Sequence, residues 1–223
     1  MDRKELAIRA AKGTLAFVVA LAIMTIPVAG FSSGPAWAFW AHFSLWAAGS
    51  AGFFLWRDPA LAARRLRAGP TAETEPAQKW IQGALSACMI AMIVVSALDA
   101  RFSWLAASTT TILAGHALLA LSFLAIVLVL AQNSWAASTI GVVDKQPVVA
   151  TGFYAILRHP MYAAAIPLFL SMPLALGSWF GLVFMPLIIA GMVARLLDEE
   201  DYLRRHLAGY EAYCERVRYR LVP

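Results

Sequence analysis

Charged residues are scarce in this sequence. Aspartate, glutamate, lysine and arginine make up 14% of the 223 residues, whereas hydrophobic residues make up 61%. This is far more apolar surface than a soluble domain of the same length can bury. The composition therefore indicates an integral membrane protein.

Cysteines and nucleotide-binding motifs are also nearly absent. The two cysteines are Cys88, within an apolar run, and Cys214, in the polar C-terminal tail. They are not expected to meet, so no disulfide framework is predicted. The sequence contains no glycine-rich dinucleotide fingerprint, no P-loop and no nucleophile elbow. Nothing therefore indicates the enzyme classes that these motifs mark.

The sequence instead contains a series of apolar runs. Crossing a hydrocarbon core of about 30 Å takes roughly 20 apolar residues. Four runs fit this length: residues 13–31, 36–56, 80–98 and 110–131. Two further runs, residues 162–176 and 179–197, are joined by Gly177 and Ser178, which are too few for anything but a hairpin turn. The first arm is short and contains two prolines, so we expect it to span incompletely or with a kink.

This pattern predicts an all-α fold. We expect a polytopic helical membrane protein with four transmembrane helices and a C-terminal hydrophobic helical hairpin, which gives five to six spans. Residues 1–131 form the N-terminal transmembrane helices. Residues 132–223 contain the hairpin, an amphipathic tail and the polar clusters that predict a cytosolic pocket, for which the resemblance described below implies a cofactor.

Basic residues are distributed unevenly between the apolar runs. The first twelve residues carry Arg3, Lys4, Arg9 and Lys12 and the second-to-third loop carries five more, whereas the first-to-second loop carries none. Basic loops face the cytosol, so both termini are expected there, at the inner membrane in a prokaryote. The net charge of +5 follows from this bias and from attraction to anionic lipid, and no nucleic-acid binding is predicted. A cleavable signal peptide is the alternative for the N-terminus, but the apolar run exceeds the usual length.

Two histidines, His42 and His116, lie within apolar runs. Intramembrane polar groups are functional candidates. However, no second ligand stands at metal-binding spacing from either histidine, so no metal site is predicted. We expect each histidine to be hydrogen-bonded to a neighbour.

The first polar cluster is Arg158-His159-Pro160. Proline suits the first position of a helix, and the residue before it is pushed toward an extended conformation. Arg158 and His159 should therefore stand at a helix N-terminus. Free N–H groups, the positive end of the helix dipole and the planar guanidinium make this an anion site, suited to a ligand carboxylate.

The second cluster is the acidic run of residues 198–201. Carboxylates at the end of a helix would oppose its dipole, so the helix should continue beyond residue 201. One interpretation is a solvated face with pairs of Arg195 with Glu199 and Glu200 with Arg204. In the other, the hairpin brings these carboxylates near Arg158 and His159. The resulting pocket would suit a zwitterion with an additional positive centre.

Three spaced motifs carry a family resemblance over about the last 90 residues. They are Gly-x-Tyr-x-x-x-Arg-His-Pro-x-Tyr from Gly152, Arg-x-x-x-Glu-Glu-x-x-Leu from Arg195, and Tyr-x-x-Tyr from Tyr210. Together they resemble the isoprenylcysteine carboxyl methyltransferase family and its phospholipid methyltransferase relatives. The resemblance implies S-adenosylmethionine as the cofactor. Its carboxylate, ammonium and sulfonium match the pocket described above.

The resemblance also implies residue roles. Tyr154, His159, Pro160, Met161 and Tyr162 would bind the cofactor, with Arg158 beside them, and Gln146, Val148 and Val149 would line the adenosyl site. Glu199 would take the cationic portion of the cofactor, and Arg195 would face the substrate. Gln146 departs from the pattern, because the eukaryotic enzymes have histidine there.

We therefore predict a membrane-embedded methyltransferase acting on a lipophilic or small acceptor that arrives from the bilayer, most like isoprenylcysteine carboxyl methylation. For a carboxylate acceptor, Arg195 is the candidate cation. For an acceptor that must lose a proton, Glu200 or a tyrosine is the candidate helper. The alternatives are a phospholipid amine, a small thiol, or a non-enzymatic transporter or solute-binding protein. A transporter often shows internal repeats or paired broken helices, and none is seen.

Overall fold

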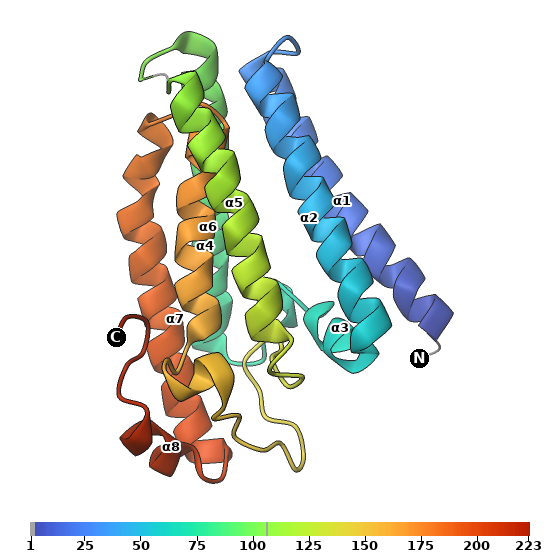
Figure 1. Ribbon diagram of the computed structural model, residues 1–223, viewed down its shortest axis with the longest axis vertical. Coiled ribbons are helices and arrows are strands. Elements are labelled where there is room, and N and C mark those ends of the chain that lie inside the picture. Colours follow the sequence, from blue (N-terminus) through green and yellow to red (C-terminus); the bar gives the residue numbers. More distant parts are fainter. Residues whose placement is uncertain (1–2, 106) are drawn as a thin grey trace.

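The computed structural model describes residues 3–105 and 107–223 (Figure 1). Within these ranges the chain forms α-helices and short 3-10 turns, joined by loops, and the predicted all-α class is confirmed. The α-helices are α1 (Arg3–Ala29), α2 (Gly34–Arg57), α3 (Pro59–Arg65), α4 (Pro76–Phe102), α5 (Thr109–Leu130), α6 (Pro160–Ala175), α7 (Met185–His206) and α8 (Tyr210–Arg216). The 3-10 turns are η1 (Pro70–Ala72), η2 (Gly152–Ala155) and η3 (Phe180–Phe184).

Four helices of the described ranges are long and apolar enough to cross a membrane. They are α1, α4, α5 and the continuous helical segment Phe180–His206, which consists of η3 and α7. Helix α2, with 24 residues, is of spanning length but is not among these four helices. Helix α6 has 16 residues, or about 24 Å at 1.5 Å per residue, which is less than the hydrocarbon core. These lengths support the predicted polytopic helical membrane protein.

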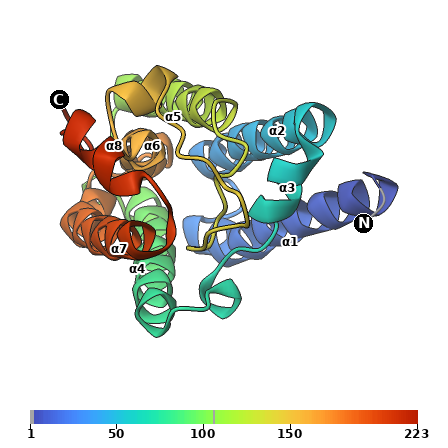
Figure 2. The same ribbon diagram turned by 90° about the horizontal axis from the view of Figure 1, so that it is seen from below.

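The long helices run alternately up and down the bundle. The start of α1, the C-terminus, α3 and α8 all lie in the lower half of the molecule in Figure 1. The connection between α5 and α6, residues 131–159, lies there too, and Figure 2 shows it crossing this end beside α3. We call the end formed by α3, α8 and residues 131–159 the polar end. The other end carries the α1–α2 turn and the hairpin turn between α6 and η3.

The hairpin turn is anchored by a buried aspartate that sequence reasoning missed. Gly177 has φ +88°, a left-handed conformation that glycine adopts without strain. Beside it, the Ser178 hydroxyl donates to fully buried Asp99 at the end of α4. Asp99 also accepts from the backbone N–H of Leu105 at 2.6 Å and of Phe180 at 3.3 Å. These bonds fix the start of η3 and hence the direction in which α7 returns to the polar end.

Helices α5 and α6 approach so closely that only glycine fits at position 115. A Cβ built on Gly115 would lie 2.5 Å from the backbone nitrogen of Ala175 and 2.8 Å from the carbonyl carbon of Leu174. Backbone atoms cannot rotate away as a side chain can, so the two helices would have to separate.

We therefore expect Gly115→Ala to lower the free energy of unfolding by about 1–3 kcal/mol, the usual range for overpacking. Thermal unfolding in detergent micelles, followed by tryptophan fluorescence, measures this effect. Gly83→Ala in α4 is the matched control, because a Cβ there meets nothing within 4 Å and alanine favours a helix. Equal melting temperatures for the two variants would contradict the close approach of α5 and α6.

Candidate functional site

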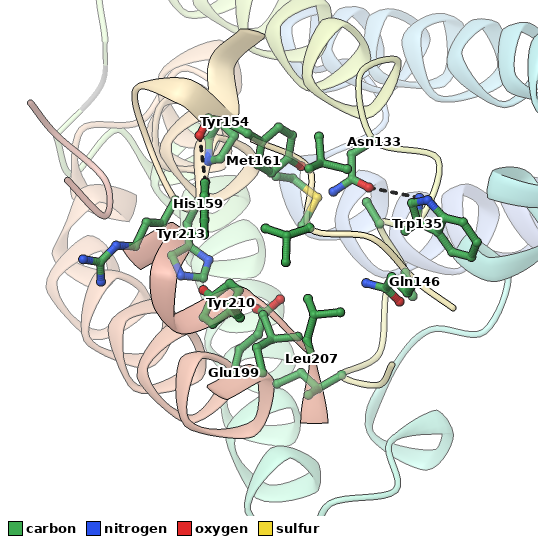
Figure 3. A pocket seen from close by; sticks show the side chains of 18 of the residues that line it. Asn133, Trp135, Gln146, Tyr154, His159, Met161, Glu199, Leu207, Tyr210 and Tyr213 are labelled. Carbon is green, nitrogen blue, oxygen red and sulfur yellow. Dashed lines mark hydrogen bonds between the residues drawn. The ribbon is translucent and has the colours of Figure 1, made fainter. Parts of the chain in front are cut away.

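A cavity lies at the polar end between the α5–α6 connection, the start of α6, the end of α7 and α8 (Figure 3). The empty space between its walls is about 840 Å³, including the part open to solvent. This is within the range of about 300–1,000 Å³ typical of small-molecule sites. Figure 3 shows His159, Glu199 and Tyr210 on one side of the cavity and Trp135 and Gln146 on the other. Four separate segments of the chain therefore converge on it.

The structure brings together all ten residues that the sequence predicted to bind a cofactor. They line this cavity: Gln146, Val148, Val149, Tyr154, Arg158, His159, Pro160, Met161, Tyr162 and Glu199. The two predicted catalytic residues, Arg195 and Glu200, are not among its lining residues. Their positions are described below, because they differ from the prediction.

The N-terminus of α6 faces the cavity as the sequence predicts. Pro160 is the first helical residue, and His159 precedes it with φ −124° and ψ 60° and makes no side-chain cap. The next two N–H groups, of Met161 and Tyr162, have no hydrogen-bond acceptor among the described residues. Such N–H groups at the positive end of a 16-residue helix favour an anion.

Glu199 supplies a negative charge to the same cavity. Its Oε2 accepts a hydrogen bond of 2.7 Å from the Tyr162 hydroxyl. No lysine, arginine or histidine of the described residues lies within ion-pair distance of it. The pair with Arg195 proposed for a solvated helix face is therefore not formed. A half-buried carboxylate without a cation partner favours a positively charged ligand.

Tyr210 contributes a buried hydroxyl that has no hydrogen-bond partner within the described ranges. The residue is 5% exposed and lines the cavity. Burial and the nearby negative charges, including Glu199, raise the pKa of its phenol, so the hydroxyl keeps its proton. An unsatisfied buried hydroxyl costs about 1–3 kcal/mol unless a ligand meets it. Sequence reasoning noted this tyrosine within the Tyr-x-x-Tyr tail but did not assign it to the site.

Glu200 does not line the cavity but belongs to a network that holds the C-terminal tail. It is 2% exposed. It accepts from Arg158 at 3.2 Å, pairs with His159 Nε2 at 3.2 Å and accepts from Arg220 at 3.0 Å. Burial acts to raise the pKa of its carboxyl, but hydrogen bonds from His159 and Arg220 outweigh it and lower the pKa to about 2. The predicted pair with Arg204 is not formed, and a carboxyl this acidic is a poor proton acceptor at neutral pH.

Arg158 also serves this network, which corrects the prediction that its guanidinium is open to a ligand. Its Nε donates to the Val217 carbonyl at 2.6 Å and its Nη2 to the Cys214 carbonyl at 2.8 Å. With Nη1 on Glu200, every guanidinium nitrogen has a protein partner. Arg158 therefore lines the cavity mainly as the anchor of the tail, and the helix N-terminus remains as the anion site.

Arg195 does not line the cavity and is instead held by buried partners within the protein. It is 8% exposed and pairs with Glu73 at 2.7 Å. It also donates to the Gln78 side chain at 2.8 Å and to the Ser138 carbonyl at 2.9 Å. The second oxygen of Glu73 accepts from the Ile140 N–H at 3.1 Å. Arg195 and Glu73 thus fix the α5–α6 connection against α7. Glu73 was missed because its segment has only the composition of a loop.

The two intramembrane histidines contact each other, which confirms that each is hydrogen-bonded to a neighbour. Their Nδ1 atoms are 3.0 Å apart across α2 and α5. Trp46 donates to His42 Nε2 at 3.0 Å. The sequence does not show this pairing, because the residues are 74 positions apart.

Residues 110–209 match a family model described as phospholipid methyltransferase. The matched segment runs from the start of α5 to the residue before α8 and contains all ten predicted cofactor-binding residues. A search of curated proteins found no match. The family match confirms the resemblance to membrane methyltransferases that the sequence motifs indicate.

Proposed function

We propose that this chain is an integral membrane methyltransferase that uses S-adenosylmethionine. The observation that carries the proposal is the cavity itself. Among the described residues, the N–H groups at the start of α6 and the Tyr210 hydroxyl have no hydrogen-bond partner, and Glu199 has no cation within ion-pair distance. When bound, S-adenosylmethionine supplies a methyl group that its sulfonium already activates. The family match over residues 110–209 supports this class of reaction.

The residues present fit this cofactor. The N–H groups at the start of α6 suit its carboxylate, and Glu199 suits a cationic centre, either the ammonium or the sulfonium. Val148, Val149 and Leu207 give the cavity apolar side chains against which the adenine ring can pack. Beside that wall, the side-chain oxygen of Gln146 accepts from the Val143 N–H at 3.1 Å, so its amide N–H groups remain to donate to a ligand.

The chain's own contribution is to orient the reactants and exclude water, because the donor needs no further activation. We assign Glu200 and Arg195 as positioning residues. Glu200 holds Arg158, His159 and the tail, and Arg195 holds the α5–α6 connection. This assignment removes Glu200, one of the two kinds of proton acceptor proposed for an amine or thiol. It favours an acceptor that is nucleophilic as it arrives, such as the carboxylate of an isoprenylcysteine.

The same assignments suggest different roles for the two parts of the chain. We propose that residues 132–223 form the cofactor-binding core and that residues 1–131 form a membrane scaffold that admits the acceptor. A phospholipid amine or small thiol remains the alternative acceptor, and a transporter or solute-binding protein remains the non-enzymatic alternative.

The test is to incubate the purified chain with S-adenosylmethionine labelled with tritium in its methyl group. The acceptors are a farnesylcysteine, phosphatidylethanolamine and a small thiol, each in detergent micelles. We expect calorimetric binding of the cofactor and transfer of label to one acceptor class. Absence of cofactor binding would overturn the proposal. Binding without transfer to any acceptor, together with uptake into vesicles, would favour the transporter.

We also propose that the polar end, with both termini, faces the cytosol, because the basic loops gather there. Reporter fusions at Gly34 and Arg101 should then behave as external, and one at Gly69 as cytosolic. A cytosolic signal at Gly34 would reverse the orientation, and the cavity would lie on the outer side.

A further inference from the structure

A second cavity lies between α2 and α5, outside the site described above. Its empty space is about 780 Å³, including the part open to the surroundings, and α1 and α3 complete its walls. Both α2 and α5 run toward the polar end (Figure 1). The lining residues of α2 lie between Ala47 and Leu55, and those of α5 between Phe123 and Leu130. We call this cavity the α2–α5 crevice.

The contact between His42 and His116 lies just beyond this crevice, on the side away from the polar end. His42 precedes Ala47 on α2, and His116 precedes Phe123 on α5. Among the described residues, this contact is the one hydrogen bond between the two helices. Next to it, Trp46 stacks on Phe123, with ring centroids 6.0 Å apart and ring planes at 11°. The histidine contact and this stack therefore hold α2 against α5 at this end of the crevice.

Hydrogen bonding fixes the tautomer of both histidines. The indole N–H of Trp46 is only a donor, and it donates to His42 Nε2 at 3.0 Å. His42 Nε2 therefore has no proton, so a neutral His42 carries its proton on Nδ1 and donates it to His116 Nδ1 at 3.0 Å. A neutral His116 then carries its own proton on Nε2. The donors and acceptors of the three side chains are therefore matched when both histidines are neutral.

One added proton disrupts this arrangement on either histidine. On His42 the added proton occupies Nε2, which then faces the Trp46 N–H as donor against donor. On His116 it occupies Nδ1, and His42 accepts from it only by moving its own proton to Nε2, so the same conflict arises. Trp46 must then turn away from His42, and its stack on Phe123 is lost. A second proton places donors on both Nδ1 atoms and breaks the bond between the helices.

The two histidines are isolated from other titratable groups. Helices α1 and α6 pack against α2 and α5. The other titratable residues of these four helices all lie toward the polar end: Arg3, Lys4, Glu5, Arg9 and Lys12 of α1, Arg57 of α2 and Tyr162 of α6. No carboxylate of these helices therefore stands beside the pair to neutralise an added proton.

We propose that Trp46, His42 and His116 form a proton-sensitive latch between α2 and α5. With both histidines neutral, the latch holds the two helices together beyond the crevice. Protonation releases Trp46, so α2 moves away from α5 and the crevice widens. The inference goes beyond the proposed methyltransferase function and does not depend on it, because the latch acts on the spacing of two helices.

The test measures the distance between α2 and α5 as a function of pH. Nitroxide labels are attached at Phe53→Cys and Leu128→Cys, two exposed positions beside the crevice. Cys88→Ala and Cys214→Ala remove the native thiols. The labelled parent is the full chain, purified in dodecyl maltoside micelles. Pulsed electron paramagnetic resonance should give a longer distance at pH 5 than at pH 8, the range in which histidine titrates.

Trp46→Phe keeps an aromatic ring beside Phe123 but removes the indole N–H. The first proton then meets no opposing donor, so we expect the midpoint of the distance change to fall by about one pH unit, the equivalent of one hydrogen bond. Trp37→Phe is the matched control, because Trp37 lies on the same helix but donates to the Phe31 carbonyl. It should leave the midpoint unchanged. His116→Phe leaves no hydrogen bond between the helices and should remove the dependence on pH.

The same distance at pH 8 and pH 5 in the labelled parent would overturn the proposal. So would equal midpoints for the parent and Trp46→Phe, or a pH response that persists in His116→Phe, because either result places the titrating group elsewhere. Should His116→Phe fail to fold, the comparison of Trp46→Phe with Trp37→Phe decides alone. Calorimetric binding of S-adenosylhomocysteine is measured in parallel at pH 8. Its absence refutes the proposed function and leaves the latch standing, whereas binding with an unchanged distance refutes the latch alone.

Discussion

Glu199→Gln is expected to weaken binding of S-adenosylmethionine by about 10- to 100-fold, corresponding to about 1.5–3 kcal/mol for a hydrogen bond or contact with a charged group. The substitution keeps the size of the side chain and a group that can accept from the Tyr162 hydroxyl. It removes the negative charge, which has no cation of the described residues within ion-pair distance. Isothermal titration calorimetry in detergent measures the change.

Measuring the affinity for S-adenosylhomocysteine as well shows which charge Glu199 contacts. This demethylated product lacks the sulfonium charge but keeps the ammonium. A larger loss for S-adenosylmethionine than for the product places the carboxylate near the sulfonium. Equal losses place it near the ammonium. Asp201→Asn serves as the control, since Asp201 belongs to the same acidic run but is exposed. If Glu199→Gln binds both ligands as the wild type does, Glu199 has no role in the cofactor cavity.

Glu200→Gln is expected to destabilise the folded protein by about 3–5 kcal/mol, the usual effect of removing one partner from a buried ion pair. The neutral amide would leave Arg158 without its counter-ion and would weaken the link from Arg220 to α7. Because the tail carries Tyr210, cofactor affinity should fall together with the melting temperature. Glu215→Gln is the matched control, as Glu215 is an exposed glutamate on α8.

The pH dependence of stability tests the same network. Folding lowers the pKa of the Glu200 carboxyl from 4.5 to about 2. Since the folded pKa is the lower one, its contribution to stability is present above pH 4.5 and is lost as the pH falls toward 2. The shift corresponds to about 3.5 kcal/mol at 1.4 kcal/mol per pKa unit. The wild type should therefore lose more stability than Glu200→Gln between pH 5 and pH 3. Parallel melting curves for the two proteins would show that Glu200 is not the ionised centre of the network.

Local sequence signals located most of the residues that line the cavity at the polar end. Pro160 fixed the start of α6, and the acidic run predicted that α7 would continue past residue 201, as it does to His206. These predictions succeeded because the φ restriction of proline and the dipole of a helix act within one or two turns. Tyr210 was not assigned, because the sequence does not show whether its hydroxyl lacks a partner.

The spacing of residues along the sequence did not predict which residues pair with the buried charges. Arg195 was expected to pair with Glu199 or a substrate, but it pairs with Glu73, which lies 122 positions away. Glu200 was expected to pair with Arg204 or to accept a proton, but it is shared by Arg158, His159 and Arg220. An exposed i,i+4 pair contributes only a few tenths of a kcal/mol. A distant segment that packs against the carboxylate and buries it can therefore supply a stronger partner than the i,i+4 neighbour.

The sequence by itself determined that this is a helical membrane protein, where its long helices lie, and which segment carries the polar clusters. These features follow from the length of apolar runs and from the conformations that proline and glycine permit. The tertiary structure alone decided which charges are neutralised within the protein and which remain for ligands. That choice separates Glu200 and Arg195, which hold the tail and the connection, from Glu199, which has no cation of the described residues within ion-pair distance. It depends on desolvation by distant segments, because burying a charge without a partner is far more costly than any local pairing is favourable.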